Sequence, residues 1–123
     1  MAIHDDSRHE VDRRARRFQR VRNAHQTEVA EDYVELIADL IDLKGEARLV
    51  DLAECFGVTK PTVNGAIQRL QRDGLVDSAP YRSILLTEKG RRLAEVARER
   101  HQVVRDLLLA LGVDAETADG GCG

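Results

Sequence analysis

The sequence contains no tryptophan, and aromatic residues make up only 3% of its 123 residues. Leu, Ile, Val and Ala must therefore supply the core, and such a composition favours helices. Only two cysteines are present, Cys55 and Cys122, which is not the pattern of a secreted disulfide scaffold. The longest apolar runs, such as 107–111, fall far short of the ~20 residues that span a membrane, and the N-terminus lacks the apolar stretch of a signal peptide. We therefore expect a soluble, cytoplasmic protein with one core.

The chain also lacks a large net charge, at −3, but its charges are segregated along the sequence. Residues 8–22 hold seven arginines against two acids, residues 28–54 hold nine acids against two basic residues, and residues 60–92 hold seven basic residues against three acids. Phosphate binding depends on local basic surface rather than on total charge. The third segment can therefore face nucleic acid although the whole chain is slightly acidic.

Hydrophobic periodicity predicts a mainly α-helical protein with one small β-hairpin. Residues 1–10 show little periodicity and are expected to form a mobile tail, whereas apolar residues from Tyr33 to Ile41 recur at helical spacing. The further predicted elements are short helices over 49–56 and 60–73, strands over 75–77 and 83–86, and a long last helix from Thr87 to Gly112 with an apolar stripe of Leu93, Val96, Ala97, Val104, Leu107, Leu108 and Leu111.

The two short helices have the pattern of a helix-turn-helix. Helices that cross closely need a small residue inside the first, a glycine in the turn and apolar residues at the crossing. Ala53 is the small residue, Gly57 is the turn, and Thr59 and Pro61 suit the start of the second helix. The predicted apolar seam is Leu52, Phe56, Val58, Val63 and Ala66. The hairpin that follows has a basic and aromatic tip, so the fold predicted is a winged helix-turn-helix, with a generic helical hairpin as the alternative.

If the helix over 60–73 enters the major groove of DNA, its first turns face the bases. Asn and Gln can contact adenine edges, Lys can reach guanine or phosphate, and Thr methyl groups can touch thymine. Arginines farther along the helix and at the hairpin tip suit phosphates. The predicted DNA-contacting residues are Thr59, Lys60, Thr62, Asn64, Gln68, Arg69, Arg72, Tyr81 and Arg82. For any one of them, a solvated helix face is the alternative.

A stripe of carboxylates lies on the predicted helix before this motif. Its members are Glu28, Asp32, Glu35, Asp39 and Asp42. Spacings of four and three residues place them on one helical face, where like charges repel by a few tenths of a kcal/mol per pair, roughly. Water, arginine partners or a cation must offset this repulsion, and the spacing alone leaves the choice open.

Four segments resemble the manganese transport regulators of the diphtheria toxin repressor family. They are 31–37, 45–53, the Thr87-Glu88-Lys89-Gly90 start of the last helix, and Arg98-Glu99-Arg100-His101, and the resemblance covers about 18–113 in the same order. It implies a dimeric winged-helix repressor that binds palindromic operator DNA when Mn(II) or Fe(II) is bound. It also implies that Asp32, Glu35 and His101 are metal ligands. Carboxylate oxygens and one imidazole suit Mn(II), a fairly hard ion.

The resemblance ends before the family's site is complete. After residue 113 the family continues into a helix with a Glu-Gly-x-Glu-His-His type motif and then a dimer interface, whereas this chain ends with residues 119–123. We therefore expect the start of a truncated helical dimerisation domain and a weakened or lost response to metal. The expected organisation is a basic, partly helical extension over 1–25, a winged helix-turn-helix over 26–90, a linking helix over 91–112 and a disordered tail over 113–123.

The function predicted is a manganese-responsive repressor of manganese uptake genes. One alternative is a metal-independent DNA-binding module, in which the acidic stripe pairs with the arginines of 13–22; another is a regulator uncoupled from metal. An enzyme is not expected, because the sequence shows no Ser/His/Asp or Cys/His arrangement and no phosphate-binding glycine loop.

Overall fold

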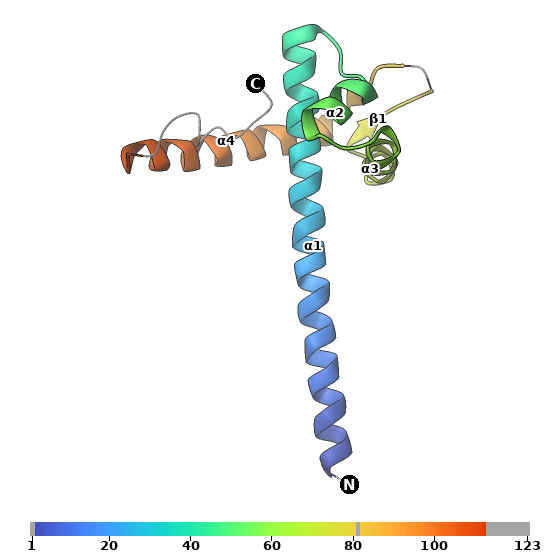
Figure 1. Ribbon diagram of the computed structural model, residues 1–123, viewed down its shortest axis with the longest axis vertical. Helices are drawn as coiled ribbons and strands as arrows, with labels where there is room; N and C mark the ends of the chain where they lie inside the picture. The colour runs from blue at the N-terminus through green and yellow to red at the C-terminus, as the bar shows by residue number, and fades with distance from the viewer. Residues whose placement is uncertain (1, 81, 113–123) are drawn as a thin grey trace. The chain divides into compact units, whose positions relative to one another are not determined.

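A computed structural model describes residues 2–80 and 82–112, with side chains from residue 7 onward. The elements in chain order are α1 (Ala2–Lys44), α2 (Leu49–Phe56), α3 (Lys60–Arg72), β1 (Val76–Asp77), β2 (Leu85–Leu86) and α4 (Glu88–Ala110). Figure 1 shows this order along the ribbon. The chain forms two compact units, one ending at Ala30 and the other beginning at Glu31. The predicted mainly helical protein with one hairpin is confirmed.

The first unit is the N-terminal part of α1, which begins at Ala2. Residues 2–10 are therefore helical, where the sequence showed little helical periodicity. Glu10 lies 2.9 Å from the guanidinium of Arg13 and 3.2 Å from that of Arg14. The hydrogen bond from Arg14 and the charge of Arg13 lower the pKa of Glu10. Pairs at this spacing support helix in a segment with few apolar residues, which explains why hydrophobic periodicity missed it.

The second unit has an aliphatic core, as the composition requires. Its buried side chains come from every element from the end of α1 to the start of α4, and those with no exposed area are Val34, Ile37, Ala47, Leu52, Val63 and Ala97. The rings of Tyr33 and Phe56 pack with their centroids 4.6 Å apart. The last turns of α1 are therefore part of the same core as the helix-turn-helix.

The helix-turn-helix has the bounds predicted for its first helix and ends one residue earlier than predicted in its second. Gly57 has a φ of 66°, a left-handed conformation that suits glycine. The Thr59 hydroxyl accepts a hydrogen bond from the Thr62 amide, which confirms it as the cap of α3. Of the five predicted seam residues, Leu52, Val63 and Ala66 are buried and Phe56 is half-buried, but Val58 is 39% exposed.

The hairpin is shorter than predicted. Val76 pairs with Leu86 and Asp77 with Leu85 in an antiparallel register. Ile84, which was expected in the second strand, instead donates its amide hydrogen bond to the Ala47 carbonyl at 2.8 Å. This isolated bridge ties the hairpin to the segment before α2. It therefore places the wing beside the start of α2.

The start of α4 is fastened to the turn after α3. The Thr87 hydroxyl accepts from the Gly90 amide at 3.1 Å and donates to the Gly74 carbonyl at 2.6 Å. The Lys89 ammonium group donates to the Asp73 carbonyl at 3.0 Å. Gly90 is buried against Leu75 and Leu86. These contacts fix where α4 begins relative to the wing.

The expected apolar stripe of α4 is only partly covered. Ala97 is fully buried, whereas Val104 is 49% exposed, Leu107 59% and Leu111 72%. None of the described helices is long and apolar enough to cross a membrane. Cys122 and the tail expected over 113–123 lie outside the described residues.

Candidate nucleic-acid interface and metal-ligand residues

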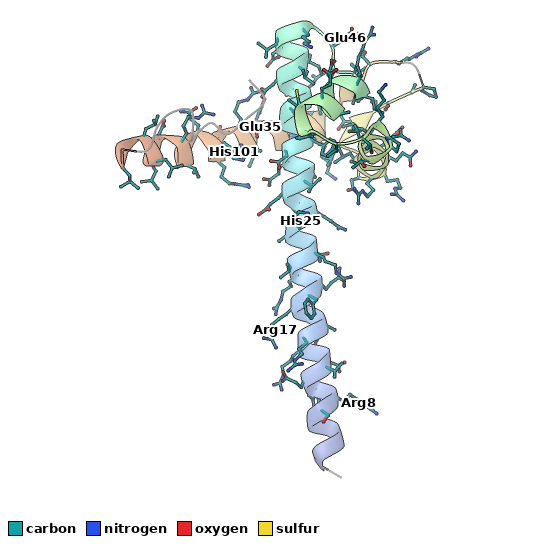
Figure 2. The ribbon with its side chains drawn as sticks, viewed as in Figure 1. Arg8, Arg17, His25, Glu35, Glu46 and His101 are labelled. Atoms are coloured by element: carbon teal, nitrogen blue, oxygen red, sulfur yellow. The ribbon has the colours of Figure 1, made fainter. Side chains whose placement is uncertain are left out.

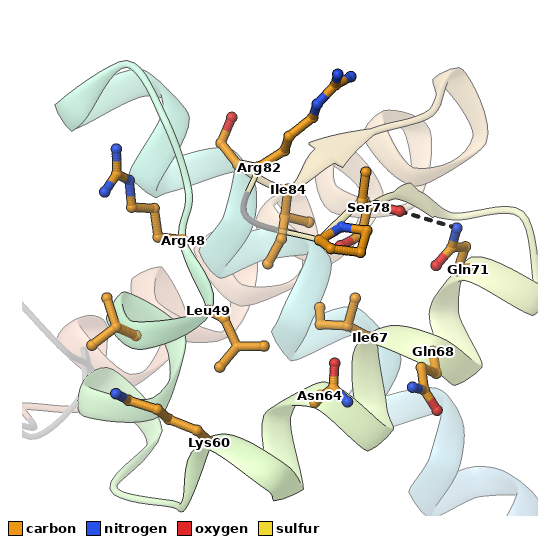
Figure 3. Close-up of a pocket in the computed structure, with 14 residues that line it drawn as sticks. Arg48, Leu49, Lys60, Asn64, Ile67, Gln68, Gln71, Ser78, Arg82 and Ile84 are labelled. Carbon is orange, nitrogen blue, oxygen red and sulfur yellow. Dashed lines mark hydrogen bonds between the residues drawn. The ribbon is translucent and has the colours of Figure 1, made fainter.

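A groove of about 930 Å³ separates α3 from the wing. Figure 3 shows Lys60, Asn64 and Gln68 on α3 and Arg82 on the wing. Of the described residues that line the groove, three are basic, namely Arg48, Lys60 and Arg82, and none is acidic. Its floor is apolar, with Ile67 and Ile84 both buried. A surface of this kind attracts phosphates through its edges and presents amide side chains between them.

The spacing of α3 sorts its residues between core and groove. Val63, Ala66, Ile67 and Leu70 face the core, so Asn64 and Gln68, which each directly follow a core residue, fall on the open side. Both are exposed, as is Lys60 at the first turn. The Gln71 amide donates to the Ser78 carbonyl at 3.3 Å and joins α3 to the wing. Lys60, Asn64, Gln68 and Arg82 thus lie together as the DNA-facing hypothesis requires.

The other described residues predicted to contact DNA are not among those that line this groove. Thr59 and Thr62 share a hydroxyl–hydroxyl hydrogen bond of 2.8 Å at the α3 cap. Arg69 lies on the side of α3 toward Tyr33: burial raises the pKa of that phenol, and the charge of Arg69 opposes the rise. Arg72 borders a second, smaller hollow with Gln68 and Gln71. Tyr81 lies outside the described residues.

Arg48 is a groove residue that the sequence did not reveal. It precedes α2, far along the chain from the wing, and the Ala47–Ile84 bridge joins the residue before it to the wing. Its guanidinium lies 2.9 Å from the Glu46 carboxylate, in a pair whose side chains are 63% and 46% exposed. Exposed pairs of this kind contribute little stability, so a phosphate can compete for the guanidinium.

The acidic stripe of α1 faces the basic residues of α4 within the second unit. The Asp39 carboxylate lies 2.5 Å from the Arg98 guanidinium, and the same guanidinium is 3.9 Å from Asp42. The neighbouring Glu31, with a side chain only 9% exposed, pairs with Arg100 at 2.7 Å. Arginine partners therefore offset the repulsion. The partners that the structure gives to Asp39 and Asp42 come from α4, whereas Arg13, Arg14 and Arg17 pair with Glu10 within the first unit.

Two of the three predicted metal ligands meet. His101 Nδ1 lies 2.7 Å from Glu35 Oε2, with side chains 44% and 19% exposed, and Figure 2 shows the two residues where α1 and α4 meet. Asp32 lies about one turn earlier on α1 and is exposed. Within the described part of the chain, no three His, Cys, Asp or Glu side chains gather closely enough to hold a metal ion. The carboxylate and imidazole fit Mn(II) by donor type, as two ligands of an incomplete set.

The fold and the groove together define a winged helix-turn-helix protein of the DNA-binding type. The profile of the family described as "Iron dependent repressor, N-terminal DNA binding domain" matches residues 25–84. The chain is 50% identical over 101 residues to the transcriptional regulator MntR of Escherichia coli O6:H1, covering 82% of this chain and 65% of that protein. It is 37% identical over 86 residues to the HTH-type transcriptional regulator MntR of Oceanobacillus iheyensis, covering 70% of this chain and 58% of that one.

A solved structure described as a manganese-dependent transcriptional repressor in complex with manganese is also similar. It superposes with a TM-score of 0.64 at 29% identity, covering 73% of this chain and 44% of that one. Residues 25–84 thus resemble the DNA-binding domain of iron-dependent repressors, and the chain as a whole is similar to the MntR regulators. It spans about 65% of the length of the Escherichia coli relative.

Proposed function

We propose that this chain is the DNA-binding part of a manganese-responsive transcription regulator that represses manganese uptake genes. The observation that carries the proposal is the groove between α3 and the wing, with three basic side chains and no acidic one among its described lining residues. The names of the similar proteins, transcriptional regulator and manganese-dependent repressor, support the same function. The proposal places the protein in the cytoplasm with the DNA and assigns no catalytic role to any residue.

In this proposal α3 enters the major groove and the wing follows the neighbouring backbone. Asn64 and Gln68 read base edges, because carboxamides can accept and donate at once to adenine. Lys60 and Arg82 hold phosphates on either side and set the register without reading sequence. Arg48 adds a third cation at the edge of the same surface. Affinity then comes mainly from the cations and selectivity from the amides.

The operator proposed is palindromic and the protein a homodimer, with two α3 helices about 34–36 Å apart along the DNA. The exposed apolar side chains of α4 support a partner surface there, since Leu107 and Leu111 are each more than half exposed. A symmetric dimer would cover such a surface with its own copy.

The metal part of the proposal assigns Mn(II), or Fe(II), to Glu35 and His101 with Asp32 beside them. A bound cation would supply positive charge that holds carboxylate and imidazole together. Glu35 and His101 come from α1 and α4, so their contact links the core helix of the DNA-binding fold to the helix that leaves it. This contact can therefore couple metal binding to how α3 is presented, provided metal binding and DNA binding favour the same arrangement.

A metal-independent DNA-binding module is the second candidate function. The ion pairs favour it, because Arg98 and Arg100 already neutralise three of the acids on α1 and His101 bonds directly to Glu35. In that case the α1–α4 contact is structural, and metal has no effect on DNA affinity.

The DNA-binding proposal predicts selective binding by the 123-residue chain. A sequence would first be selected from a random duplex library, and anisotropy would then compare the selected duplex with a scrambled one at fixed salt. We expect at least about 1,000-fold tighter binding to the selected duplex, as for specific regulators. Equal affinity for both duplexes would contradict a regulatory role and leave only general attraction to polyanions.

The metal proposal predicts weak Mn(II) binding by this chain that depends on Glu35. Only Glu35 and His101 meet among the proposed ligands, and no three such side chains gather in the described part of the chain. We therefore expect a dissociation constant well above the micromolar range, measured through the electron paramagnetic resonance signal of free Mn(II). Glu35→Gln should abolish the binding, whereas Glu99→Gln, an exposed carboxylate elsewhere on α4, should not.

Two outcomes would count against this assignment. Micromolar binding at full stoichiometry would mean that other residues complete the site. Binding that survives Glu35→Gln, or DNA affinity indifferent to Mn(II) in every variant, would favour the metal-independent module.

A further inference from the structure

All but one of the glycines in the described residues are explained by the fold itself. Four have positive φ angles, where an L side chain is strained: Gly45, Gly57, Gly74 and Gly112. Gly90 has helical geometry, but a Cβ there would collide with the Leu75 carbonyl. The remaining glycine is Gly65, in the second turn of α3.

Gly65 satisfies neither condition. It lies within α3, its φ is not positive, it is exposed, and a Cβ built on it would meet nothing within 4 Å. Glycine in a helix interior loses more conformational entropy on folding than alanine and weakens the helix. No contact within the described protein offsets this loss of helix stability. We therefore look for the reason for the glycine in a contact with another molecule.

The position of Gly65 on α3 indicates which other molecule would approach the helix there. It directly follows Asn64 and is three residues before Gln68, and both of these line the groove. Residues three apart on a helix are neighbours on its surface, so Gly65 and Gln68 share the open face of α3. Glycine is favoured where the backbone of one molecule approaches another closely.

We propose that Gly65 is where the backbone of α3 comes closest to the major groove of DNA. The missing side chain lets α3 lie deeper in the groove, so that the short amide side chain of Asn64 can reach a base edge. This inference rests on the proposed function, because it names the residue that sets the depth of the same contact.

The test uses one series of variants and two measurements. Gly65→Ala is expected to raise the melting temperature of the free protein by about 3–6 °C, since alanine is the better helix former. The same variant should weaken binding to the selected duplex by about tenfold, comparable to a lost base contact. Gly65→Leu, with similar helix propensity and a larger side chain, should weaken binding further. Affinity for scrambled DNA, which depends on phosphates, should change less.

Thr27→Ala is the matched control, because it raises helix propensity at an exposed position of α1 that is not among the residues lining the groove. It should leave affinity for the selected duplex unchanged. Wild-type affinity in both Gly65 variants would overturn the inference while leaving the proposed function in place. Weaker binding by Gly65→Ala with recovery in Gly65→Leu would also overturn it, since that pattern reports helix flexibility rather than space. A wild-type chain that does not distinguish the two duplexes would overturn the proposed function and this inference together.

Discussion

Replacing Gly90 by alanine is expected to lower the free energy of unfolding by about 3 kcal/mol, the upper part of the range for inserting a methyl group into a packed site. A Cβ at this position would lie 3.0 Å from the Leu75 carbonyl carbon and closer still to its oxygen, and 3.2 Å from a methyl group of Leu86. The carbonyl cannot move freely, because it accepts a hydrogen bond from the Thr87 amide at 3.1 Å. The added methyl group must therefore push α4 away from the wing.

Thermal melting followed by circular dichroism would measure this effect. Gly65→Ala is the matched control, since it is the same chemical change in a helix but at a position where the Cβ meets nothing. The two variants should shift the melting temperature in opposite directions, with Gly90→Ala lower by more than about 10 °C. A Gly90→Ala protein as stable as the wild type would mean that the start of α4 does not pack against Leu75 in solution.

Removing two cations of the groove is expected to weaken binding to any duplex. Lys60→Gln combined with Arg82→Gln should lower affinity by roughly 30-fold per chain at physiological salt, if each cation neutralises one phosphate. The slope of log affinity against log salt should fall by about two per chain, because two fewer counterions are released. The ratio between selected and scrambled duplexes should change little, since phosphate contacts carry no sequence information.

Anisotropy titrations across a range of salt concentrations would measure both quantities. The matched control is Arg91→Gln with Arg92→Gln, which removes the same charge from α4 outside the groove lining. An equal loss in the control would mean that net charge, rather than the groove, determines affinity. A large loss of selectivity in the groove variant would instead assign base reading to Lys60 or Arg82.

Local sequence predicted the helix-turn-helix well because its signals act within a few residues. Thr59 caps α3 through the amide three residues later, and Gly57 allows the left-handed turn. Val63 and Ile67 are apolar and lie at helical spacing, so both face the core. Asn64 and Gln68 are therefore left on the open side of α3. The exposed face of α3, which we propose contacts DNA, was therefore predictable from periodicity.

The same reasoning was weaker wherever the partner of a residue lies far along the chain. Periodicity does not show that the charge of Arg69 acts on Tyr33, where it opposes the rise that burial causes in the pKa of the phenol. Periodicity placed Ile84 in the second strand, yet its backbone amide donates a hydrogen bond to the Ala47 carbonyl. A helical wheel gives the direction of a side chain around its own helix but not which neighbouring element it meets there.

The sequence by itself determined the fold class, the caps and turns of the helix-turn-helix and the spacing of the acidic stripe, because each depends on contacts within one or two helical turns. Only the tertiary structure decided that Arg48 joins the groove, that Gly90 must lack a side chain, and that Arg98, Arg100 and His101 face the acids of α1. These features depend on contacts between different elements of the fold. Their geometry is set by how the aliphatic core closes, because the core fixes where α4 and the wing pack against the earlier helices.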